Sequence, residues 1–223
     1  MTTMTFDTTT FEKLHKTEAW MYTNVSALAK IDFALDSTVV DEATIQAFDI
    51  APANSFVVLI NGVFSEEASR MGSGIEINAN HELEGTVADR GESEIPKLDC
   101  DSVTISNSQK QTVHVLQLVT GDSATAASGR VLIYAAKGET VSVAETHVCL
   151  GDSSHLFMPL TEIVAEANAN VTLVRALRGS NTAYQLGQLH VCQHESSEVQ
   201  THTITLAGKL SRNEVSVYLD GKH

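Results

Sequence analysis

The stretch Val131-Leu-Ile-Tyr-Ala-Ala-Lys-Gly-Glu-Thr-Val-Ser-Val143 decides the fold, because the chain repeats its pattern as Thr161-Glu-Ile-Val-Ala-Glu-Ala-Asn-Ala-Asn-Val-Thr-Leu173, at an offset of 30 residues. The superposition places Ile133 on Ile163, Gly138 on Asn168 and Val141 on Val171. A further offset of 28 residues carries these positions to Val191, Ser196 and Val199. Each unit has the pattern of a strand, a turn of small or polar residues, and a second strand.

This near-constant period predicts the stacked coils of a parallel β-solenoid. Alternating polarity alone would also fit an antiparallel sandwich, which stays open as the second possibility. A coil cannot bury its own inner face, so neighbouring coils must stack to complete the core. We therefore expect Ile133, Ile163 and Val191 in one inward-facing column.

The two parts of the chain differ in their pattern of polar and apolar residues. Apolar residues at helical spacing, including Phe11 and Leu14, predict short helices in the first fifty residues. Asn61-Gly62 between apolar segments predicts a hairpin at 56–65, because both positions accept positive φ. Gly72 to Ser108 is expected to be loop and boundary. The predicted fold is mainly β: an α/β N-terminal capping region (1–100) precedes a right-handed parallel β-helix over 101–223 that is incomplete at its C-terminus.

Composition excludes several classes of function. The 223 residues contain 14 Lys plus Arg against 28 Asp plus Glu, and a net charge of −14 repels nucleic acid. No apolar run approaches the roughly 20 residues that span a bilayer, and the N-terminus lacks a secretory apolar segment. We expect a cytoplasmic protein without membrane contact. Cys100, Cys149 and Cys192 are too widely spaced for a disulfide framework or a paired zinc motif, which predicts thiols.

One segment has the composition of a metal site: His190-Val-Cys192-Gln-His194. Alternate residues of a strand share a face. Leu189 and Val191 are expected to face the core, so the two histidines and Cys192 should face outward. A flat strand spreads such ligands too far apart for one ion, so we interpret them as surface side chains and not as ligands. His147-Val-Cys149 has the same geometry and could align with this segment on a neighbouring coil.

The remaining motifs do not indicate catalysis. The Gly-Asp-Ser strings at Gly121 and Gly151 lack the strand-to-helix nucleophile elbow and are predicted to be turns. Gly72-Ser-Gly74 is not a phosphate loop, and the Walker A sequence is absent, so any ATPase must be a partner. We expect Trp20 and Tyr22 to be core or interface anchors, with core positions favoured. Arg212, beside Asn213 at a predicted solenoid corner, is expected to donate hydrogen bonds to turn carbonyls.

Three separated segments resemble the SufD family, the β-helical scaffold subunit of the SUF iron–sulfur cluster assembly machinery. The segments are Glu18-Ala-Trp-Met-Tyr-Thr23, Phe56-Val-Val-Leu-Ile-Asn-Gly62, and a C-terminal set made of Thr161-Glu-Ile-Val, Gly187-Gln-Leu-His-Val and Ser211-Arg-Asn-Glu-Val-Ser-Val-Tyr-Leu-Asp-Gly221. Asn78 to Asp99 departs from the family pattern, and family members are longer. The resemblance therefore implies an N-terminal fragment or truncated relative. It also implies a SufB-like paralogue and a SufC-like ATPase as partners, with an iron–sulfur cluster only at the level of the assembled complex and no cofactor in this chain.

The leading hypothesis is a non-enzymatic scaffold subunit. The alternatives are a β-solenoid carbohydrate-active enzyme and a structural binding module. The enzyme would need carboxylates clustered on one face, whereas Glu139, Glu145 and Glu162 are scattered. The last strand, which contains Val215 and Val217, is expected to be uncapped, which predicts possible self-association through the C-terminal coil.

Overall fold

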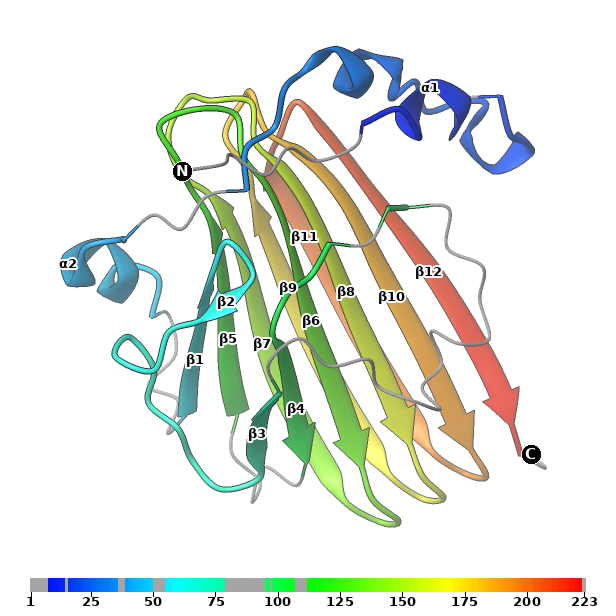
Figure 1. Ribbon diagram of the computed structural model, residues 1–223. Coiled ribbons are helices and arrows are strands. Elements are labelled where there is room, and N and C mark those ends of the chain that lie inside the picture. Colours follow the sequence, from blue (N-terminus) through cyan, green and yellow to red (C-terminus); the bar gives the residue numbers. More distant parts are fainter. Residues whose placement is uncertain are drawn as a thin grey trace.

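The structure is a computed structural model that describes residues 8–14, 16–35, 39–49, 55–78, 95–96, 98–106 and 112–221. Twelve strands form two six-stranded sheets, with strand orders β11-β9-β7-β5-β1-β2 and β12-β10-β8-β6-β4-β3 (Figure 1). The strands are β1 (Ser55–Ile60), β2 (Val63–Phe64), β3 (Ile75–Asn78), β4 (Ser102–Ser106), β5 (Thr112–Val119), β6 (Ala126–Ala135), β7 (Thr140–Cys149), β8 (Leu156–Ala165), β9 (Asn170–Arg178), β10 (Tyr184–His194), β11 (Glu198–Ala207) and β12 (Leu210–Asp220).

From β5 onward the chain alternates between the two sheets, so each coil contributes one strand to each sheet. Strands of successive coils pair in parallel: β5 with β7, β7 with β9, and β9 with β11. In the other sheet β6 pairs with β8, β8 with β10, and β10 with β12. The predicted parallel β-solenoid is confirmed, and the antiparallel sandwich is excluded.

The corner residues identified by the repeat share one backbone conformation. Gly138, Asn168 and Ser196 have φ values of 74°, 60° and 57°. This left-handed conformation is costly for most residues, and glycine and asparagine tolerate it best. The corners also stack, because the Gly138 amide donates to the Ala167 carbonyl and the Asn168 amide donates to the Glu195 carbonyl, each at 3.0 Å.

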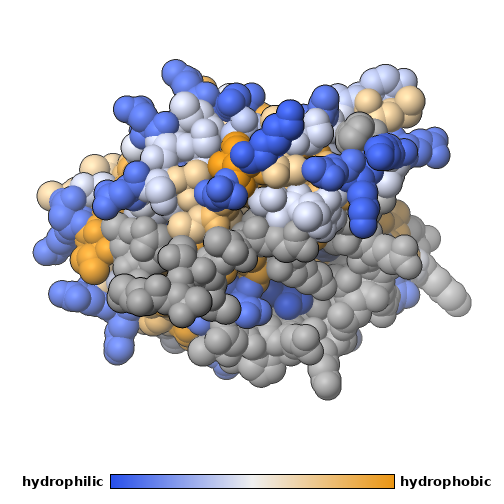
Figure 2. Space-filling view, turned by 45° about the horizontal axis from the view of Figure 1, so that its top comes forward, coloured by the Kyte–Doolittle hydropathy of each residue, from blue (hydrophilic) through white to orange (hydrophobic). Residues whose placement is uncertain are grey.

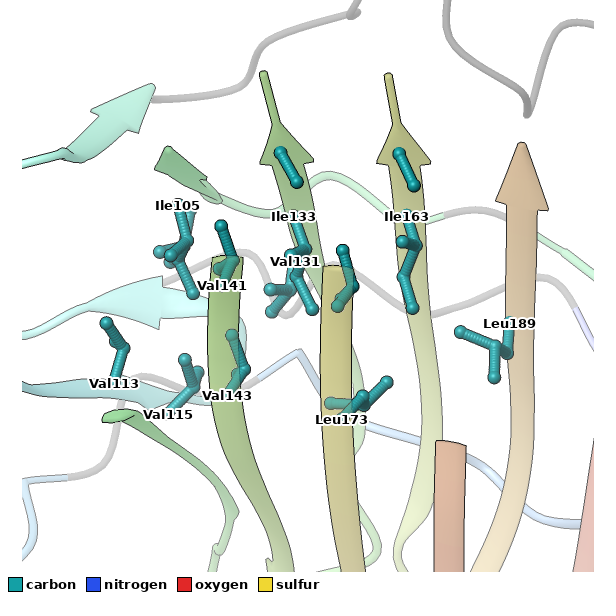
Figure 3. Close-up of a cluster of buried hydrophobic side chains, with 14 of the residues drawn as sticks. Ile105, Val113, Val115, Val131, Ile133, Val141, Val143, Ile163, Leu173 and Leu189 are labelled. Carbon is teal, nitrogen blue, oxygen red and sulfur yellow. The ribbon is translucent and has the colours of Figure 1, made fainter. Parts of the chain in front are cut away.

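The hydrophobic core lies between the two sheets. Ile133 pairs in register with Ile163, and Ile163 pairs with Val191. All three are buried in one cluster, as the repeat predicted. Figure 3 shows their neighbours, such as Val143 and Leu173, pointing into the same space. Each fully buried aliphatic side chain of this kind contributes roughly 1.5–3 kcal/mol of transfer free energy.

The predicted hairpin at 56–65 is confirmed, since β1 and β2 pair antiparallel across Asn61 and Gly62, both with positive φ. A Cβ atom at Gly62 would also collide with the Ser128 carbonyl oxygen. β1 pairs in parallel with β5 as well, so the stacked sheets extend to residues before 101.

The stretch from Gly72 to Ser108 is not all loop. β3 lies within it and pairs antiparallel with β4, which belongs to the part from residue 101 onward that was predicted to be β, so the loop prediction was wrong for β3. Periodicity gave no signal because β3 has only four residues. Residues 79–94, 97 and 107–108 of this stretch lie outside the described residues, and with them most of the segment from Asn78 to Asp99 that departs from the SufD pattern.

Short helices precede the sheets, as expected: α1 (Phe11–Leu14), the 3₁₀ helices η1 (Glu18–Trp20) and η2 (Ser26–Lys30), and α2 (Glu42–Gln46). α1, η1 and η2 pack against one end of β6, β8 and β10, whereas α2 packs against the outer face of β1, β5 and β7. Hydrophilic residues cover much of the coloured surface of the face drawn in Figure 2. No helix in the described ranges is both long and apolar enough to cross a membrane.

The last coil exposes apolar side chains. Val215, Val217 and Leu219 on β12 are 59%, 52% and 63% exposed, although their register partners on β10 include the buried Leu189 and Val191. Among the described strands, β11 and β12 each pair on one side only. Within the described residues, β12 therefore presents apolar side chains and an unpaired edge.

Candidate functional site

The solenoid interior is not apolar throughout. Along β7 the inward positions run from Val141 and Val143 to Glu145 and His147, so the core changes from hydrophobic to polar within one strand. Side chains from five strands meet there. We call them the interior polar cluster: Gln117 (β5), Glu145 and His147 (β7), Thr161 (β8), Arg175 (β9) and Gln185 (β10).

Glu145 is the centre of the interior polar cluster, and its side chain is fully buried. Its Oε1 accepts hydrogen bonds from Gln117 Nε2 at 2.6 Å and from Thr161 Oγ1 at 3.1 Å. Its Oε2 accepts from Thr161 Oγ1 at 2.9 Å and lies 3.2 Å from Arg175 Nε. His147 Nε2 lies 2.9 Å from Oε1. One carboxylate thus connects three successive strands of one sheet with the facing sheet.

Burial alone would raise the pKa of Glu145. The positive charge of His147 in its protonated form and that of Arg175, with hydrogen bonds from His147 and Thr161, outweigh it and lower the pKa to about 2. Burial also lowers the pKa of His147 below its usual value, although Glu145 opposes this. We therefore assign a neutral imidazole at pH 7, which donates from Nε2 to Glu145 and accepts at Nδ1 from Gln185, 2.8 Å away. Arg175 then carries the charge that balances Glu145.

Gly129 of the facing sheet leaves space for these polar side chains. A Cβ atom at Gly129 would collide with the Gln117 amide oxygen, whereas one at Gly187 would make an ordinary contact with Arg175 Nη2 at 3.5 Å and a tight one with Asn213 Oδ1 at 2.9 Å. Nη1 and Nη2 of Arg175 have no hydrogen-bond acceptor among the described residues. The interior polar cluster thus depends on a glycine at position 129 in the facing sheet.

The chemistry of the interior polar cluster is structural. A carboxylate with a pKa of about 2 is a weak proton acceptor at neutral pH. Glu145 and Arg175 are also sealed from solvent, so a substrate has no direct access to them. Breaking a buried ion pair is strongly destabilising. We conclude that the interior polar cluster connects the coils.

Our reading of the sequence did not recognise this cluster, because it treated Glu145 as one of several scattered acids. A usable signal was present. Gln117, Glu145 and Arg175 fall on the inward phase of their strands, and Glu145 and Arg175 are in register at the 30-residue offset. Polar residues that recur on the inward phase at the period of the coils indicate an internal polar layer.

The outward-facing segment of β10 differs from the prediction in burial. Alternation placed His190, Cys192 and His194 away from the core correctly. However, His190 is 6% and Cys192 5% exposed, so these two are not surface side chains. His190 is in register with Glu162 of β8 and Ser216 of β12. Within the described part of the chain, no three His, Cys, Asp or Glu side chains are grouped to hold a metal ion.

The possible alignment of His147 and Cys149 with this segment is excluded. β7 and β10 belong to different sheets, because successive strands alternate between the two layers. His147 joins the interior polar cluster instead. Burial raises the pKa of the Cys149 thiol to about 12.

The Gly-Asp-Ser strings at residues 121–123 and 151–153 lie in the connections β5–β6 and β7–β8, as predicted. Strand β3, and not a helix, follows Gly72-Ser-Gly74. The positions of the two Gly-Asp-Ser strings between strands agree with the predicted turns.

Trp20 is fully buried, as predicted, but Tyr22 is 92% exposed, so its predicted core position was wrong. Arg212 lies within β12 and not at a corner. Its guanidinium carbon is 4.1 Å from the centroid of the Trp20 ring, and its Nη2 donates to the Ala19 carbonyl at 2.9 Å. Arg212 therefore donates to a backbone carbonyl, as predicted. That carbonyl belongs to the N-terminal helical segment and not to a turn of the solenoid, so Arg212 connects the last strand to this segment.

Part of the chain matches a known protein family. No curated protein matches the chain. Residues 117–223, which contain the whole interior polar cluster, match the family model for the SufBD core domain, described as SUF system FeS cluster assembly. This match supports the SufB/SufD family level for this segment of the chain.

Proposed function

We propose that the chain is a non-enzymatic scaffold subunit of an iron–sulfur cluster assembly complex, of the SufD type. The observation that carries the proposal is the match of residues 117–223 to the SufBD core domain, over the coils that the structure shows as a parallel solenoid. A role in the SUF system is supported at the family level. The SufD type rests on the three resembling segments of the sequence.

The proposed partners are a SufB-like paralogue and a SufC-like ATPase, in the cytoplasm. Any ATPase must be a partner, because the sequence has no Walker A motif. The iron–sulfur cluster is the cargo of the assembled complex, and the chain itself holds no resident cofactor in this proposal.

The carbohydrate-active alternative is not favoured. Such an enzyme requires two carboxyl groups on either side of one glycosidic bond. Glu145 lies inside the solenoid, whereas Glu162 is buried on the outward phase of β8, where its Oε2 lies 2.8 Å from Arg130 Nη2. Two carboxylates on opposite sides of the β-sheet layers cannot act on one substrate.

Co-expression tests the proposal. The chain, with an affinity tag, is produced together with the SufB-like and SufC-like proteins encoded in the same genome, and complexes are isolated by affinity and size-exclusion chromatography. We expect all three proteins to co-elute, with ATP hydrolysis only when the ATPase is present. A SufB–SufC complex that forms while excluding the tagged chain would overturn the proposal, and so would ATP or polysaccharide hydrolysis by the chain alone.

A further inference from the structure

The C-terminal end of β10 brings a thiol, an imidazole and a carboxylate together on the outer face of one sheet. Cys192 and His194 share this face because they are two residues apart on one strand. Cys192 Sγ lies 3.9 Å from His194 Nε2. β12 pairs with β10 so that Asp220 is in register with His194, and Asp220 Oδ2 lies 3.9 Å from His194 Nδ1.

We propose that Cys192 is a reactive thiol that forms mixed disulfides with low-molecular-weight disulfides, with His194 as its base and Asp220 as the group that orients His194. A nucleophile, a base and a third group that orients the base form the arrangement that activates cysteine in many enzymes. The separations are longer than ideal hydrogen bonds, as is common in such sites before a ligand binds. This inference stands independently of the proposed scaffold function.

Two exposed side chains border the buried sulfur. The side chains of His194 and Asp220 are 32% and 60% exposed, whereas Cys192 is 5% exposed. Reaction with a small disulfide therefore requires the exposed His194 side chain to move aside from the sulfur. Tyr218 of β12 and Val164 of β8 are in register with Cys192.

The charged and titratable groups around the site come from three strands. His190 lies two residues before Cys192 on β10, Glu162 of β8 is in register with His190, and Asp220 and Tyr218 come from β12. Asp220 is the carboxylate in register with His194, so it is the group placed to orient the imidazole.

The chain provides its own reference thiols. Burial raises the pKa of Cys149 to about 12, and burial also raises the pKa of Cys100. Thiolates, not thiols, are the nucleophiles in disulfide exchange. Cys149 is about as buried as Cys192 (7% and 5% exposed), so the expected difference between them rests on His194, which lies 3.9 Å from the Cys192 sulfur. Burial alone acts on the Cys149 thiol, and Cys149 and Cys100 should therefore react slowly in the folded protein.

The proposed reaction is balanced. The Cys192 thiol transfers its proton to His194 Nε2, and the thiolate attacks one sulfur of the disulfide R–S–S–R. A Cys192 S–S–R bond forms, the original S–S bond breaks, and the departing R–S⁻ takes the proton back as R–SH. The Cys192 sulfur is oxidised, and the departing sulfur is reduced.

The experiment follows the reaction of the full-length protein with oxidised glutathione at pH 7, with the modified cysteine identified by mass spectrometry. Rates for single thiols are measured on Cys100→Ser/Cys149→Ser, which retains Cys192, and on Cys100→Ser/Cys192→Ser, which retains Cys149. We expect Cys192 to react at least tenfold faster than Cys149. His194→Gln should slow the reaction of Cys192 with oxidised glutathione about tenfold, because an ordinary thiol is only a few per cent thiolate at pH 7. The same variant should show a steeper increase in this rate from pH 6 to pH 8.

His202→Gln is the matched control, since His202 is an exposed histidine on β11 in the other sheet. It should leave the rate unchanged. Asp220→Asn should slow Cys192 by about threefold. Circular dichroism confirms folding, and in urea the thiols of all variants should react alike. Equal native rates for Cys192 and Cys149 would overturn the proposal, and so would a folded His194→Gln variant with the parent rate and pH dependence.

Discussion

Removing the charge of Arg175 should destabilise the solenoid severely. The guanidinium is fully buried, and its Nε lies 3.2 Å from Glu145 Oε2. Arg175→Met retains most of the side-chain volume and leaves Glu145 buried without its cationic partner. Breaking a buried pair in this way costs about 3–5 kcal/mol. Domains of this size are typically stable by about 5–15 kcal/mol, so the loss is a large part of the total.

The double variant separates the contribution of the ion pair from the contribution of side-chain packing. Glu145→Gln alone leaves Arg175 without its carboxylate and should cost a similar free energy. Glu145→Gln with Arg175→Met removes both charges, and its cost should fall short of the sum of the two single costs by about 2 kcal/mol or more. Direct contact between the two side chains is the reason for this coupling.

Urea unfolding at pH 7, followed by circular dichroism, measures each free energy of unfolding. Arg178→Met is the matched control: Arg178 is an exposed arginine on the same strand, 5.1 Å from the Phe48 ring centroid. Loss of that contact should cost no more than about 1 kcal/mol. Additive single costs, or an Arg175→Met variant as stable as the Arg178 control, would refute the structural role of the interior polar cluster.

Three further predictions follow from other features. The pKa of Glu145 falls from 4.5 to about 2 on folding, so its carboxylate contributes about 3 kcal/mol to the free energy of unfolding above pH 4.5, and this contribution disappears as the pH falls toward 2. Urea unfolding measured across this pH range should show the loss, and a Glu145→Gln variant that loses stability with falling pH as steeply as the parent would contradict it. Exposed Val217 should promote association, so light scattering at rising concentration should show growing mass for the parent and a monomer for Val217→Lys; a parent that stays monomeric would refute this. Asn168→Val should cost about 1–2 kcal/mol in thermal or urea unfolding because its φ is 60°, whereas Asn168→Gly should be nearly neutral, and equal effects of the two would exclude backbone strain.

The sequence by itself determined the architecture of the coils. A repeat of 30 and 28 residues fixed which positions stack, and the structure places Ile133, Ile163 and Val191 in one buried column. The corner residues, of which Gly138 and Asn168 are examples, could be located because a tight corner demands positive φ, and few residue types accept it. Local conformation and periodicity are properties of the chain itself, so they can be inferred without knowing its neighbours.

Only the tertiary structure decided what each face contacts. Alternation assigned Cys192 to the outer face, but alternation carries no information on what covers that face, and Cys192 is buried. The same limit applies to Tyr22, whose exposure depends on packing of the N-terminal segment. Sheet membership is also a tertiary property: with two strands per coil, β7 and β10 lie in different sheets although their sequences look alike. Glu145 and Arg175 meet because parallel stacking brings residues 30 positions apart into register, and burial then turns two scattered charges into one ion pair.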